Sequence, residues 1–204
     1  MKLLLTSSGL DNPKLKEEFL RLVGKPASEI KVLFIPTASR TKEELCYLMD
    51  SWKELLGLGI LEQNIIKYNL EGEVDKDIDV MYVCGGNTFY LLHKFRESGF
   101  DKKFKEFIER GVICVGVSAG SMIMGPDIDV CGIRSYWDQN DVGLKDLTGL
   151  NITDKRISPH YVDDDEVAII KYEKKGNKKV LRLRDGSALR ISEDGEEVLG
   201  KIIN

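Results

Sequence analysis

A serine between glycines, at the end of an apolar run, is the feature of this sequence best suited to covalent chemistry. The segment Gly116-Val117-Ser118-Ala119-Gly120 matches the pattern Gly-x-Ser-x-Gly and follows a hydrophobic stretch over residues 112–117. Small flanking residues allow a sharp strand-to-helix turn that holds the serine in strained backbone with its hydroxyl exposed. The amides of the next helix face the same point, so Ala119 N–H can donate to an oxyanion. We expect Ser118 to be a nucleophile; the structural alternative is a glycine-rich turn that only packs a helix onto a strand.

A serine nucleophile needs a base, and the chain contains only two histidines. His93 lies in the middle of an expected helix, where a surface or packing role is the simpler interpretation. His160 follows Pro159 and lies well downstream of the serine. The order of nucleophile first and histidine last is that of the α/β-hydrolases, with an acid expected between them. We therefore expect His160 to be the general base.

A second glycine pair, in Cys84-Gly85-Gly86-Asn87-Thr88, lies between a predicted strand and a predicted helix. Glycines at a strand's carboxyl end allow close backbone approach, and Asn87 or Thr88 can cap the helix. We expect Gly86 N–H to be the second oxyanion donor and Asn87 to contact substrate, because ligands bind at this end of open α/β sheets. A βα turn without function is the alternative. The dinucleotide-binding pattern Gly-x-Gly-x-x-Gly and a P-loop lysine are both absent from the sequence, so we expect no nucleotide cofactor.

Composition limits the class of partner. Apolar residues make up 42% and charged residues 31% of the 204-residue chain, and the net charge is -4. This describes a globular protein without the basic field that nucleic acid or an anionic membrane would attract. The apolar start at residues 1–5 is too short for a signal peptide and reads as a first strand. We expect a cytoplasmic protein with no membrane span, and the sequence leaves its oligomeric state open, a homodimer included.

The cysteines do not form a metal or disulfide pattern. No Cys-x-x-Cys pair occurs among them, and no histidine lies near them in the sequence; they are Cys46, Cys84, Cys114 and Cys131. A zinc site and a disulfide framework are therefore unexpected. Cys84 and Cys114 read as small core residues. We expect the chemistry to use no metal and no organic cofactor.

Alternating strand and helix patterns predict an α/β fold with three layers. Apolar runs that barely alternate indicate strands covered on both faces, as in a parallel sheet. These predicted strands are residues 2–6, 30–36, 65–69, 80–84 and 112–117. Helical spacing of apolar residues falls between them, over residues 14–23, 42–56, 88–96 and 102–109. We expect right-handed crossovers and one domain over residues 1–204.

The C-terminal third follows a different pattern. Residues 126–153 are rich in Asp, Gly and Asn and read as loops. Beyond residue 179, short alternating runs are separated by Asp185-Gly186 and Asp194-Gly195, which are strong hairpin signals. The prediction is a small antiparallel β-meander at one edge of the sheet. The acidic run at residues 163–166 is interpreted as a solvated face; if it bordered the site, it would attract a free amino terminus.

Taken together, four motifs resemble the peptidase E (aspartyl dipeptidase) family of serine peptidases, to which cyanophycinase is more distantly related. They are Phe34-Ile35-Pro36-Thr37-Ala38-Ser39, Gly85-Gly86-Asn87-Thr88-Phe89, Gly116-Val117-Ser118-Ala119-Gly120 and Pro159-His160. The resemblance implies a flavodoxin-like fold akin to class I glutamine amidotransferases, with serine in place of their cysteine. It also implies hydrolysis of short peptides, characteristically dipeptides that begin with aspartate. Ser118 and His160 match the family's nucleophile and base, and Gly86 and Ala119 match its oxyanion donors.

The resemblance also implies an acid and an arginine that the sequence places less directly. Family members carry the third triad member after the elbow, where Asp138 is the nearest fit and Asp141 the next, or Trp137 occupies the place itself. Aspartate-specific members bind the substrate carboxylate with an arginine downstream of the histidine. No arginine occurs in residues 161–175, so Arg134 is the substitute, since a guanidinium suits a carboxylate.

The sequence therefore predicts a serine peptidase of the dipeptidase type, acting through a Ser118–His160 acyl-enzyme. Two alternatives remain open. One is a hydrolase of another small amide or acyl substrate on the same scaffold. The other is a non-catalytic relative that binds a small ligand in a site with an incomplete triad.

Overall fold

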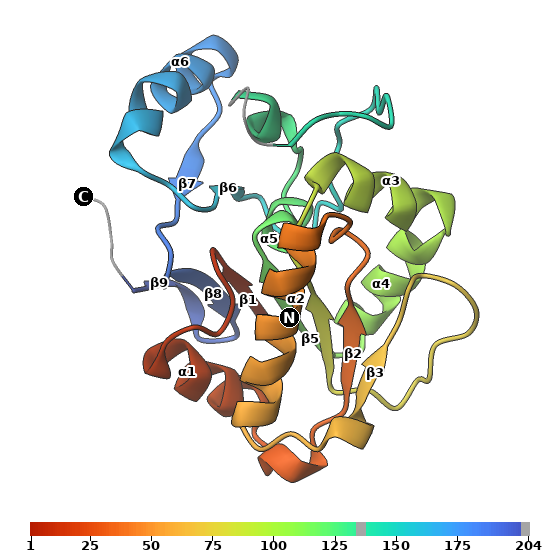
Figure 1. Ribbon diagram of the computed structural model, residues 1–204. Helices are drawn as coiled ribbons and strands as arrows, with labels where there is room; N and C mark the ends of the chain where they lie inside the picture. Colours follow the sequence, from red (N-terminus) through yellow and green to blue (C-terminus); the bar gives the residue numbers. More distant parts are fainter. Residues whose placement is uncertain (134–137, 201–204) are drawn as a thin grey trace.

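The computed structural model describes residues 1–133 and 138–200, and a seven-stranded sheet forms its centre (Figure 1). The strand order is β3-β2-β4-β5-β1-β8-β9, in which β8 and β9 run antiparallel to their neighbours and the other five strands are mutually parallel. A separate two-stranded sheet pairs β6 with β7 in parallel. The strands are β1 (Leu3–Thr6), β2 (Val32–Ile35), β3 (Ile65–Lys67), β4 (Val80–Val83), β5 (Ile113–Val117), β6 (Arg156–Ser158), β7 (Val180–Arg182), β8 (Ala188–Ser192) and β9 (Gly195–Leu199).

The five parallel strands have the flavodoxin order with one change of place. If β2 is counted as the first strand, the order becomes 2-1-3-4-5, and the N-terminal strand β1 takes the last position. The order reverses between β2 and β4, and ligands bind at the carboxyl ends of strands beside such a reversal. The loops after β2, β4 and β5 are thus brought together at one edge of the sheet.

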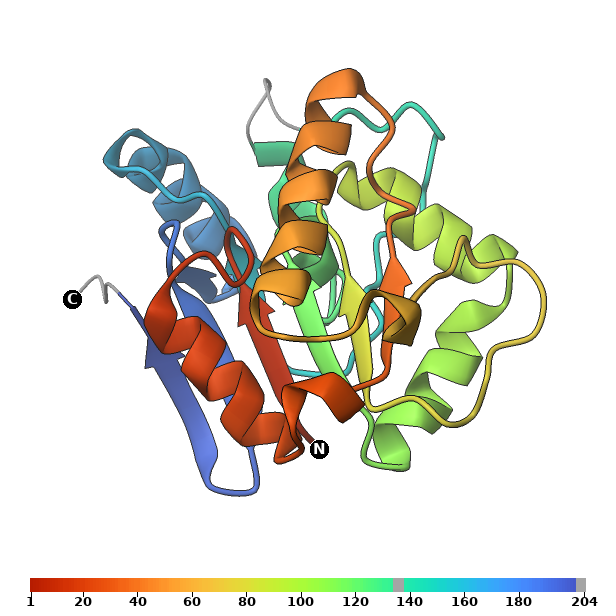
Figure 2. The same cartoon turned by 60° about the horizontal axis from the view of Figure 1, so that its bottom comes forward.

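Helices cover both faces of this sheet, as the two views in Figures 1 and 2 show. Apolar residues of α1 and α2 pack with one face, and those of α3, α4 and α5 pack with the other. The α-helices are α1 (Pro13–Val23), α2 (Lys42–Gly57), α3 (Thr88–Glu97), α4 (Phe100–Glu109), α5 (Ala119–Met122) and α6 (Glu166–Gly176). The prediction of a three-layer, mostly parallel α/β fold with antiparallel C-terminal strands is confirmed.

Local sequence signals account for where the first helices begin. The Asn12 side chain accepts a hydrogen bond from Leu15 N, and Pro13 occupies the first turn of α1, where its missing N–H costs nothing. Thr41 and Glu44 form a reciprocal capping box at the start of α2. Of the apolar side chains in α2, however, only Leu55 is fully buried, and the N-terminal half of the helix exposes Leu45, Tyr47 and Met49.

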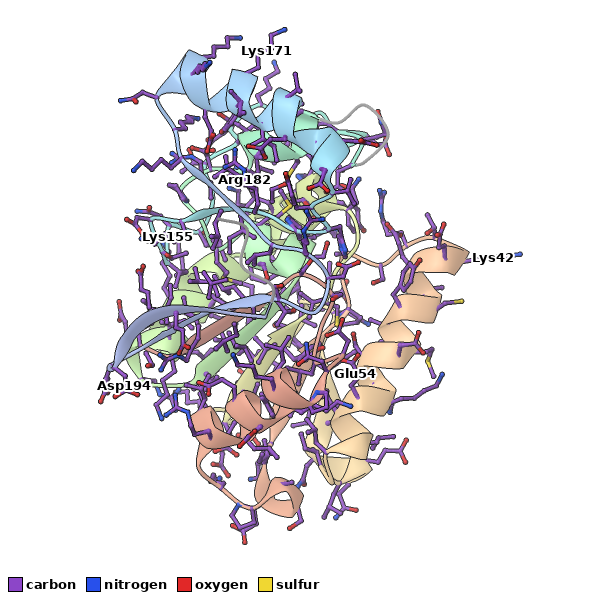
Figure 3. The ribbon with its side chains drawn as sticks, turned by 90° about the vertical axis from the view of Figure 1, so that its left-hand side faces the viewer. Lys42, Glu54, Lys155, Lys171, Arg182 and Asp194 are labelled. Carbon is purple, nitrogen blue, oxygen red and sulfur yellow. The ribbon has the colours of Figure 1, made fainter. Side chains whose placement is uncertain are left out.

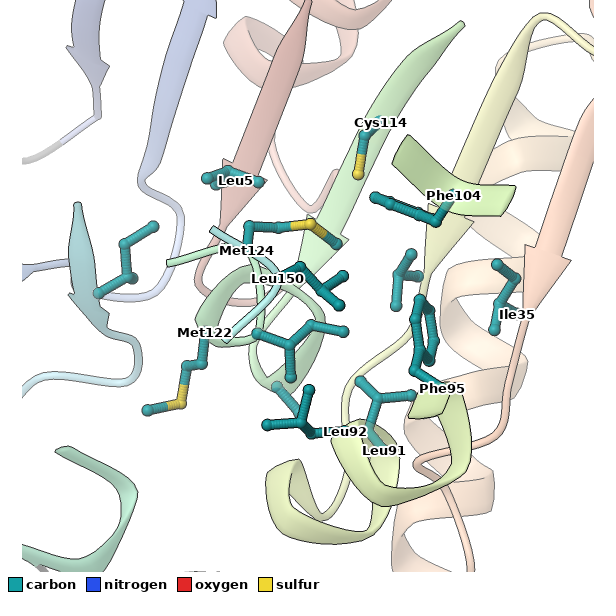
Figure 4. Close-up of a cluster of buried hydrophobic side chains, with 14 of the residues drawn as sticks. Leu5, Ile35, Leu91, Leu92, Phe95, Phe104, Cys114, Met122, Met124 and Leu150 are labelled. Carbon is teal, nitrogen blue, oxygen red and sulfur yellow. The ribbon is translucent and has the colours of Figure 1, made fainter. Parts of the chain in front are cut away.

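The core on the α3–α5 side of the sheet is continuous from the strands into the loop region (Figure 4). Phe95 and Phe104 contact each other edge to face, with ring centroids 5.6 Å apart. Met124 and Leu150, which lie outside the regular elements, are buried in the same cluster. Leu150 N donates to Ile123 O at 2.7 Å, so the long segment after α5 is tied to the core by backbone hydrogen bonds.

The predicted elements recur with small shifts at their ends, and the C-terminal third agrees with the prediction only in part. Residues 126–153 are mostly loop as expected, with a 3-10 helix at Asp129–Ile133. The acidic run at residues 163–166 is solvated at Asp163 and Asp164, as expected, but Asp165 is buried, and the run leads directly into α6. Finally, Asp194-Gly195 does form the predicted hairpin between β8 and β9, whereas Asp185-Gly186 does not. The strand before it, β7, pairs with β6 instead, because this segment leaves the main sheet to support the loop that carries His160.

In the part of the chain that the structure describes, no helix is both long enough and apolar enough to cross a membrane.

The contact between β4 and the turn after β5 is closed too tightly for any side chain. A Cβ atom on Gly120 would lie 2.2 Å from the carbonyl oxygen of Val83, and backbone atoms cannot yield at that distance. We predict that Gly120→Ala destabilises the protein by at least about 3 kcal/mol, because overpacking against backbone forces the strands apart. Gly57→Ala, at the end of α2 with no atom within 4 Å of its would-be Cβ, is the control.

Denaturant unfolding midpoints measure both changes. The control should be neutral or stabilising by up to about 1 kcal/mol, because alanine favours helix and restricts the unfolded chain. A Gly120→Ala protein as stable as the wild type would contradict the close packing described here.

Candidate active site

Ser118 is held in a backbone conformation that non-glycine residues rarely adopt. Its φ and ψ angles are 49° and -110°, at the point where β5 ends and α5 begins. The turn is held by the neighbouring strand β1, because Ser118 N donates to Thr6 O at 3.0 Å. The Ser121 hydroxyl also donates to Thr6 O, at 2.8 Å. Gly116 and Gly120 approach each other so closely that a Cβ on the former would lie 2.8 Å from backbone atoms of the latter. The Gly-x-Ser-x-Gly pattern thus folds as the predicted elbow.

The His160 ring lies against the serine. Its Nε2 is 3.0 Å from Ser118 Oγ, within hydrogen-bond distance and suited to general-base catalysis. His160 also has a positive φ of 50° and lies two residues after the end of β6. Its backbone N–H donates to the Ser7 hydroxyl at 2.7 Å, which fixes this uncommon conformation. The structure therefore brings together the two residues that the sequence paired.

The carboxylate that orients His160 belongs to Asp185. Its Oδ1 lies 2.6 Å from His160 Nδ1. This hydrogen bond lowers the pKa of Asp185, which favours the ionised carboxylate beside the imidazole ring. An acid in contact with Nδ1 selects the tautomer whose Nε2 accepts a proton from serine.

Ser7 connects the histidine to the acid. Its hydroxyl donates to Asp185 Oδ1 at 2.8 Å while accepting from His160 N. Ser7 is fully buried, and its own N–H donates to Ser187 O at 3.0 Å. The turn at Asp185 is also held from the segment after β1, since Gly186 N donates to the Ser8 hydroxyl at 2.9 Å. The Asp-Gly pair is therefore a positioned turn beside β1 and not a hairpin.

Asp138, the acid favoured from the sequence, lies elsewhere. Its Oδ2 accepts a hydrogen bond from Thr88 N at 2.9 Å, at the start of α3, whereas the carboxylate bonded to His160 Nδ1 is that of Asp185. Burial raises the pKa of Asp138 from its ordinary value. Asp141, the next choice, lies 3.8 Å from the Arg40 guanidinium and is exposed. The third choice, Trp137, lies outside the described residues. The acid was expected between serine and histidine, whereas the chain order found is serine, histidine, aspartate.

A sequence signal for Asp185 did exist, although it was interpreted differently. The residue occupies an Asp-Gly dipeptide in the turn just before β8, and β8 is the antiparallel neighbour of β1. Because β1 lies beside β5, the start of β8 and the end of β5 fall at the same edge of the sheet. Only the strand order reveals this proximity, and the dipeptide alone indicates a turn.

Two backbone amides lie close to the serine in the chain or in space, those of Ala119 and Gly86. Ala119 N–H lies in the first turn of α5, where helical N–H groups have no acceptor within the helix. Gly86 has a φ of 130°, and a Cβ there would lie 2.2 Å from Ala38 O, so this position requires glycine. Neither N–H donates a hydrogen bond within the described part of the chain. Their role as oxyanion donors stays a prediction.

The other predicted site residues are placed differently. Asn87 caps α3, with Oδ1 accepting from Tyr90 N at 2.8 Å and Nδ2 donating to Gln139 O at 2.9 Å. Because both polar atoms are engaged and the side chain is buried, the predicted contact between Asn87 and substrate is not supported. Arg134 lies outside the described residues. His93 lies on α3, where its Nε2 is 3.8 Å from a carboxylate oxygen of Glu97.

A cavity of about 690 Å³ surrounds Ser118 and His160. It lies between α2, the segment after β1 and the loops that follow β2, β4 and β5. The buried Cys84 thiol lies at its wall, and burial raises the pKa of this thiol well above its usual range, so it is not a competing nucleophile. Among residues 1–133 and 138–200, no group of three or more His, Cys, Asp or Glu side chains is arranged to hold a metal ion.

Comparison with known proteins agrees with this geometry. The model of peptidase family S51 matches residues 3–199. An uncharacterized peptidase of Pasteurella multocida (strain Pm70) is 34% identical over 166 residues, which cover 79% of this chain and 78% of that protein. A peptidase E of Shewanella sp. (strain ANA-3) is 30% identical over 160 residues, which cover 78% of this chain and 66% of that protein.

A solved structure gives the same result. The crystal structure of a protein from Listeria monocytogenes EGD-e, provisionally assigned to peptidase E, superposes with a TM-score of 0.79 at 27% identity and covers 98% of both chains. These similarities define the class of protein as a peptidase. The chain belongs to peptidase family S51, and the resemblance to peptidase E found in its motifs is confirmed.

Exchanging the two candidate acids distinguishes their roles. We predict that Asp185→Asn lowers the peptidase kcat by about 10²- to 10⁴-fold with little loss of stability, because the amide favours the wrong imidazole tautomer. The matched control is Asp138→Asn, whose amide oxygen can still accept from Thr88 N and which should retain activity within about tenfold. Steady-state kinetics on purified variants measure both; a larger loss from Asp138→Asn would reverse the assignment.

Ser7 should act on the rate through the residues that it positions. We predict that Ser7→Ala lowers kcat by about 10- to 100-fold and leaves KM nearly unchanged, because hydrogen bonds to a charged group contribute about 1.5–3 kcal/mol. The pH profile of kcat should move as well, since the Asp185 carboxylate that contacts the proposed base loses a hydrogen-bond donor.

The neighbouring Ser8 provides the control for Ser7. Its hydroxyl braces Gly186 but contacts neither His160 nor Asp185, so Ser8→Ala should stay within about threefold of wild type. Equal losses from both variants would mean that the loop as a whole, and not the Ser7 contact, had been disturbed.

Proposed function

We propose that this S51 family peptidase is a serine peptidase that hydrolyses short peptides through an acyl-enzyme. The observation that carries the proposal is the continuous chain of contacts from Ser118 Oγ through His160 to Asp185, at 3.0 and 2.6 Å, at the wall of the cavity. A serine hydroxyl is a weak nucleophile until an adjacent base accepts its proton, and this arrangement supplies that base together with an acid that orients it.

Acylation would begin at the Ser118 hydroxyl. Ser118 Oγ attacks the peptide carbonyl carbon while His160 Nε2 takes the hydroxyl proton. The carbonyl oxygen gains negative charge and is stabilised by the amides of Gly86 and Ala119, a contribution of about 3–4 kcal/mol for a donor in such a hole. His160 then gives the proton to the leaving amine, the carbon–nitrogen bond breaks, and the ester on Ser118 remains. Asp185 stabilises the imidazolium while it exists.

Deacylation reverses the roles of the attacking and leaving groups. Water donates a proton to His160 as its oxygen attacks the ester, and the proton returns to Ser118 Oγ when the acid product departs. The side chains and amides of this site, with water, provide each proton acceptor and donor in these steps.

The size of the cavity and the names of the relatives support short peptides as substrates. A volume of about 690 Å³ is within the usual range for small-molecule sites. Several related chains are named peptidase E. A requirement for aspartate as the first residue of the substrate was predicted through Arg134, the candidate partner of its carboxylate. Arg134 lies outside the described residues. Hydrolysis of another small amide or acyl compound remains the alternative on the same catalytic group.

Three further expectations from the sequence remain predictions. They are one domain over residues 1–204, a cytoplasmic location, and a protein that binds neither nucleic acid nor membrane and whose oligomeric state, a homodimer included, is open. Gel filtration with light scattering and fractionation of the producing cells would test them.

A covalent probe tests the proposed chemistry. We predict that a fluorophosphonate labels the wild-type protein at one site and that Ser118→Ala abolishes both labelling and hydrolysis of a dipeptide panel. Stability of this variant should be unchanged or higher, because strained catalytic sites trade stability for function. The control is Ser98→Ala at the end of α3, which should label and hydrolyse normally. Labelling that persists in Ser118→Ala would place the nucleophile elsewhere.

A further inference from the structure

A second cavity, of about 370 Å³, lies beside the catalytic one and differs from it in charge. It is formed where β2 and β3 end, between the loop after β2, the first half of α2 and α3. Three of its lining residues are basic, Arg40, Lys67 and Lys94, and one, Glu71, is acidic. The catalytic cavity, by contrast, has no lysine or arginine among its lining residues. A small negatively charged ligand is therefore attracted to the second cavity more than to the first.

The loop between β2 and α2 forms a wall that the two cavities share. Ser39 lines both cavities, and its hydroxyl donates to Gly85 O at 2.9 Å. Asn87 N donates to Ala38 O at 3.1 Å, which ties the same loop to the start of α3. Ser118 lines only the catalytic cavity. The second cavity is therefore a compartment of its own beside the nucleophile.

The Arg40 guanidinium in this cavity is positioned by stacking. Its Cζ lies 4.3 Å from the centroid of the Tyr90 ring, where a cation is attracted to the aromatic face. In the described ranges its side-chain nitrogens donate no hydrogen bond, and the one carboxylate within 4 Å of them is that of Asp141, at 3.8 Å. A guanidinium held by its flat face keeps the N–H groups at its edge free, and their spacing fits two oxygens of a carboxylate or phosphate.

The two lysines of the cavity differ in how far their charges are already engaged. Lys94 forms an ion pair with Glu97, and this contact raises the pKa of Lys94. Lys67, at the end of β3, is exposed, and its ammonium forms no ion pair and no hydrogen bond among residues 1–133 and 138–200. Lys67 is thus the second cation, after Arg40, that a ligand can contact without displacing a partner.

The wall also contains a hydroxyl without a partner. Thr37, in the turn before Arg40, lines the cavity, and its Oγ1 is buried and forms no hydrogen bond in the part of the chain that the structure describes. Buried hydroxyl groups nearly always have a partner, so an unpaired one at a cavity wall indicates a ligand or a water molecule that completes its hydrogen bonding. This observation is independent of the charges.

We propose that the second cavity binds a small anion with a carboxylate or phosphate group, with Arg40 as the bidentate contact and Lys67 as the second charge. The site lies where ligands of open α/β sheets bind, at the carboxyl ends of parallel strands. Its ligand is not the substrate of the proposed peptidase, and binding does not depend on turnover.

The size of the cavity and the charge of the chain favour a small ligand over a macromolecule. A volume of about 370 Å³ lies near the lower end of the range for small-molecule sites. Nucleic acid and anionic membranes need an extended basic surface, whereas this chain has a net charge of -4.

Calorimetric titration of the wild-type protein with inorganic phosphate, and separately with succinate, tests the proposal at constant ionic strength. We expect one anion to bind per chain with a Kd of about 1 mM or lower. Tighter binding of phosphate would identify a phosphorylated compound as the ligand, and tighter binding of succinate a carboxylic acid; both results support the site. Because a contact between charges is screened by salt, the affinity should fall as the ionic strength rises.

Substitutions in the cavity should weaken the binding in a defined order. Arg40→Gln should raise the Kd for the preferred anion by about tenfold or more, and Lys67→Gln by about threefold. Arg40→Lys keeps the charge but loses the bidentate fork, so its Kd should lie between those of wild type and Arg40→Gln. Both side chains are exposed, so the fold should be kept.

The matched control for Lys67 is Lys42→Gln. The Lys42 side chain, at the start of α2, extends away from the rest of the molecule and lines neither cavity (Figure 3). This variant has the same change in net charge as Lys67→Gln, and its Kd should stay within about twofold of wild type.

A further variant separates the two cavities, because an anion could also enter beside a protonated His160. His160 is the one histidine, lysine or arginine that lines the catalytic cavity. His160→Asn places a residue that tolerates positive φ at this position, and its Kd should stay within about twofold of wild type. Binding that is lost in His160→Asn but kept in Arg40→Gln would overturn the proposal. So would the absence of binding at about 20 mM phosphate or succinate, or equal weakening by Lys42→Gln and Lys67→Gln.

Discussion

The turn at Ser118 is the constraint on which the rest of the site depends. A residue with φ of 49° and ψ of -110° stores strain of about 1–3 kcal/mol, and surrounding contacts must hold it there. Those contacts come from two neighbouring strands: β1 accepts the Ser118 amide at Thr6 O, and β4 lies so close at Val83 that only glycine fits at position 120. The position of the nucleophile is therefore set by the spacing of the parallel strands, which the helices on both faces maintain.

His160 is a second residue with positive φ in the same site, and it is fixed by a different device. It follows a strand of the small sheet, outside the main one, so strand spacing cannot set its distance from Ser118. The Ser7 hydroxyl takes on that task by accepting from His160 N and donating to Asp185. The buried hydroxyl of Ser7, just after β1, thus holds the base and the acid in position relative to the serine turn. A hydrogen bond of this kind acts on geometry more than on total stability.

Features carried by a short stretch of sequence could be predicted. The elbow around Ser118, the glycine pair before α3 and the parallel strands each have a local pattern, and each occurs where its pattern indicates. His160 could be chosen because only two histidines exist. The role of Asp185 could not be predicted, because its position beside the histidine depends on the pairing of β8 with β1. Nothing in the residues next to Asp185 indicates that pairing. The predicted contact between Asn87 and substrate is unsupported for a related reason. An asparagine that caps a helix and one that contacts substrate can occur in the same local sequence.

The contact between Ser7 and Asp185 joins residues 178 positions apart, near the two ends of the chain. During synthesis the elbow and the histidine leave the ribosome well before the acid and β8, which pairs with β1. A growing chain therefore holds the serine and its base without the group that orients them, and β1 has an unpaired edge until the last strands arrive. The group that orients His160 thus depends on a strand pairing made late in the chain, so a chain cut before residue 185 would hold Ser118 and His160 without that carboxylate.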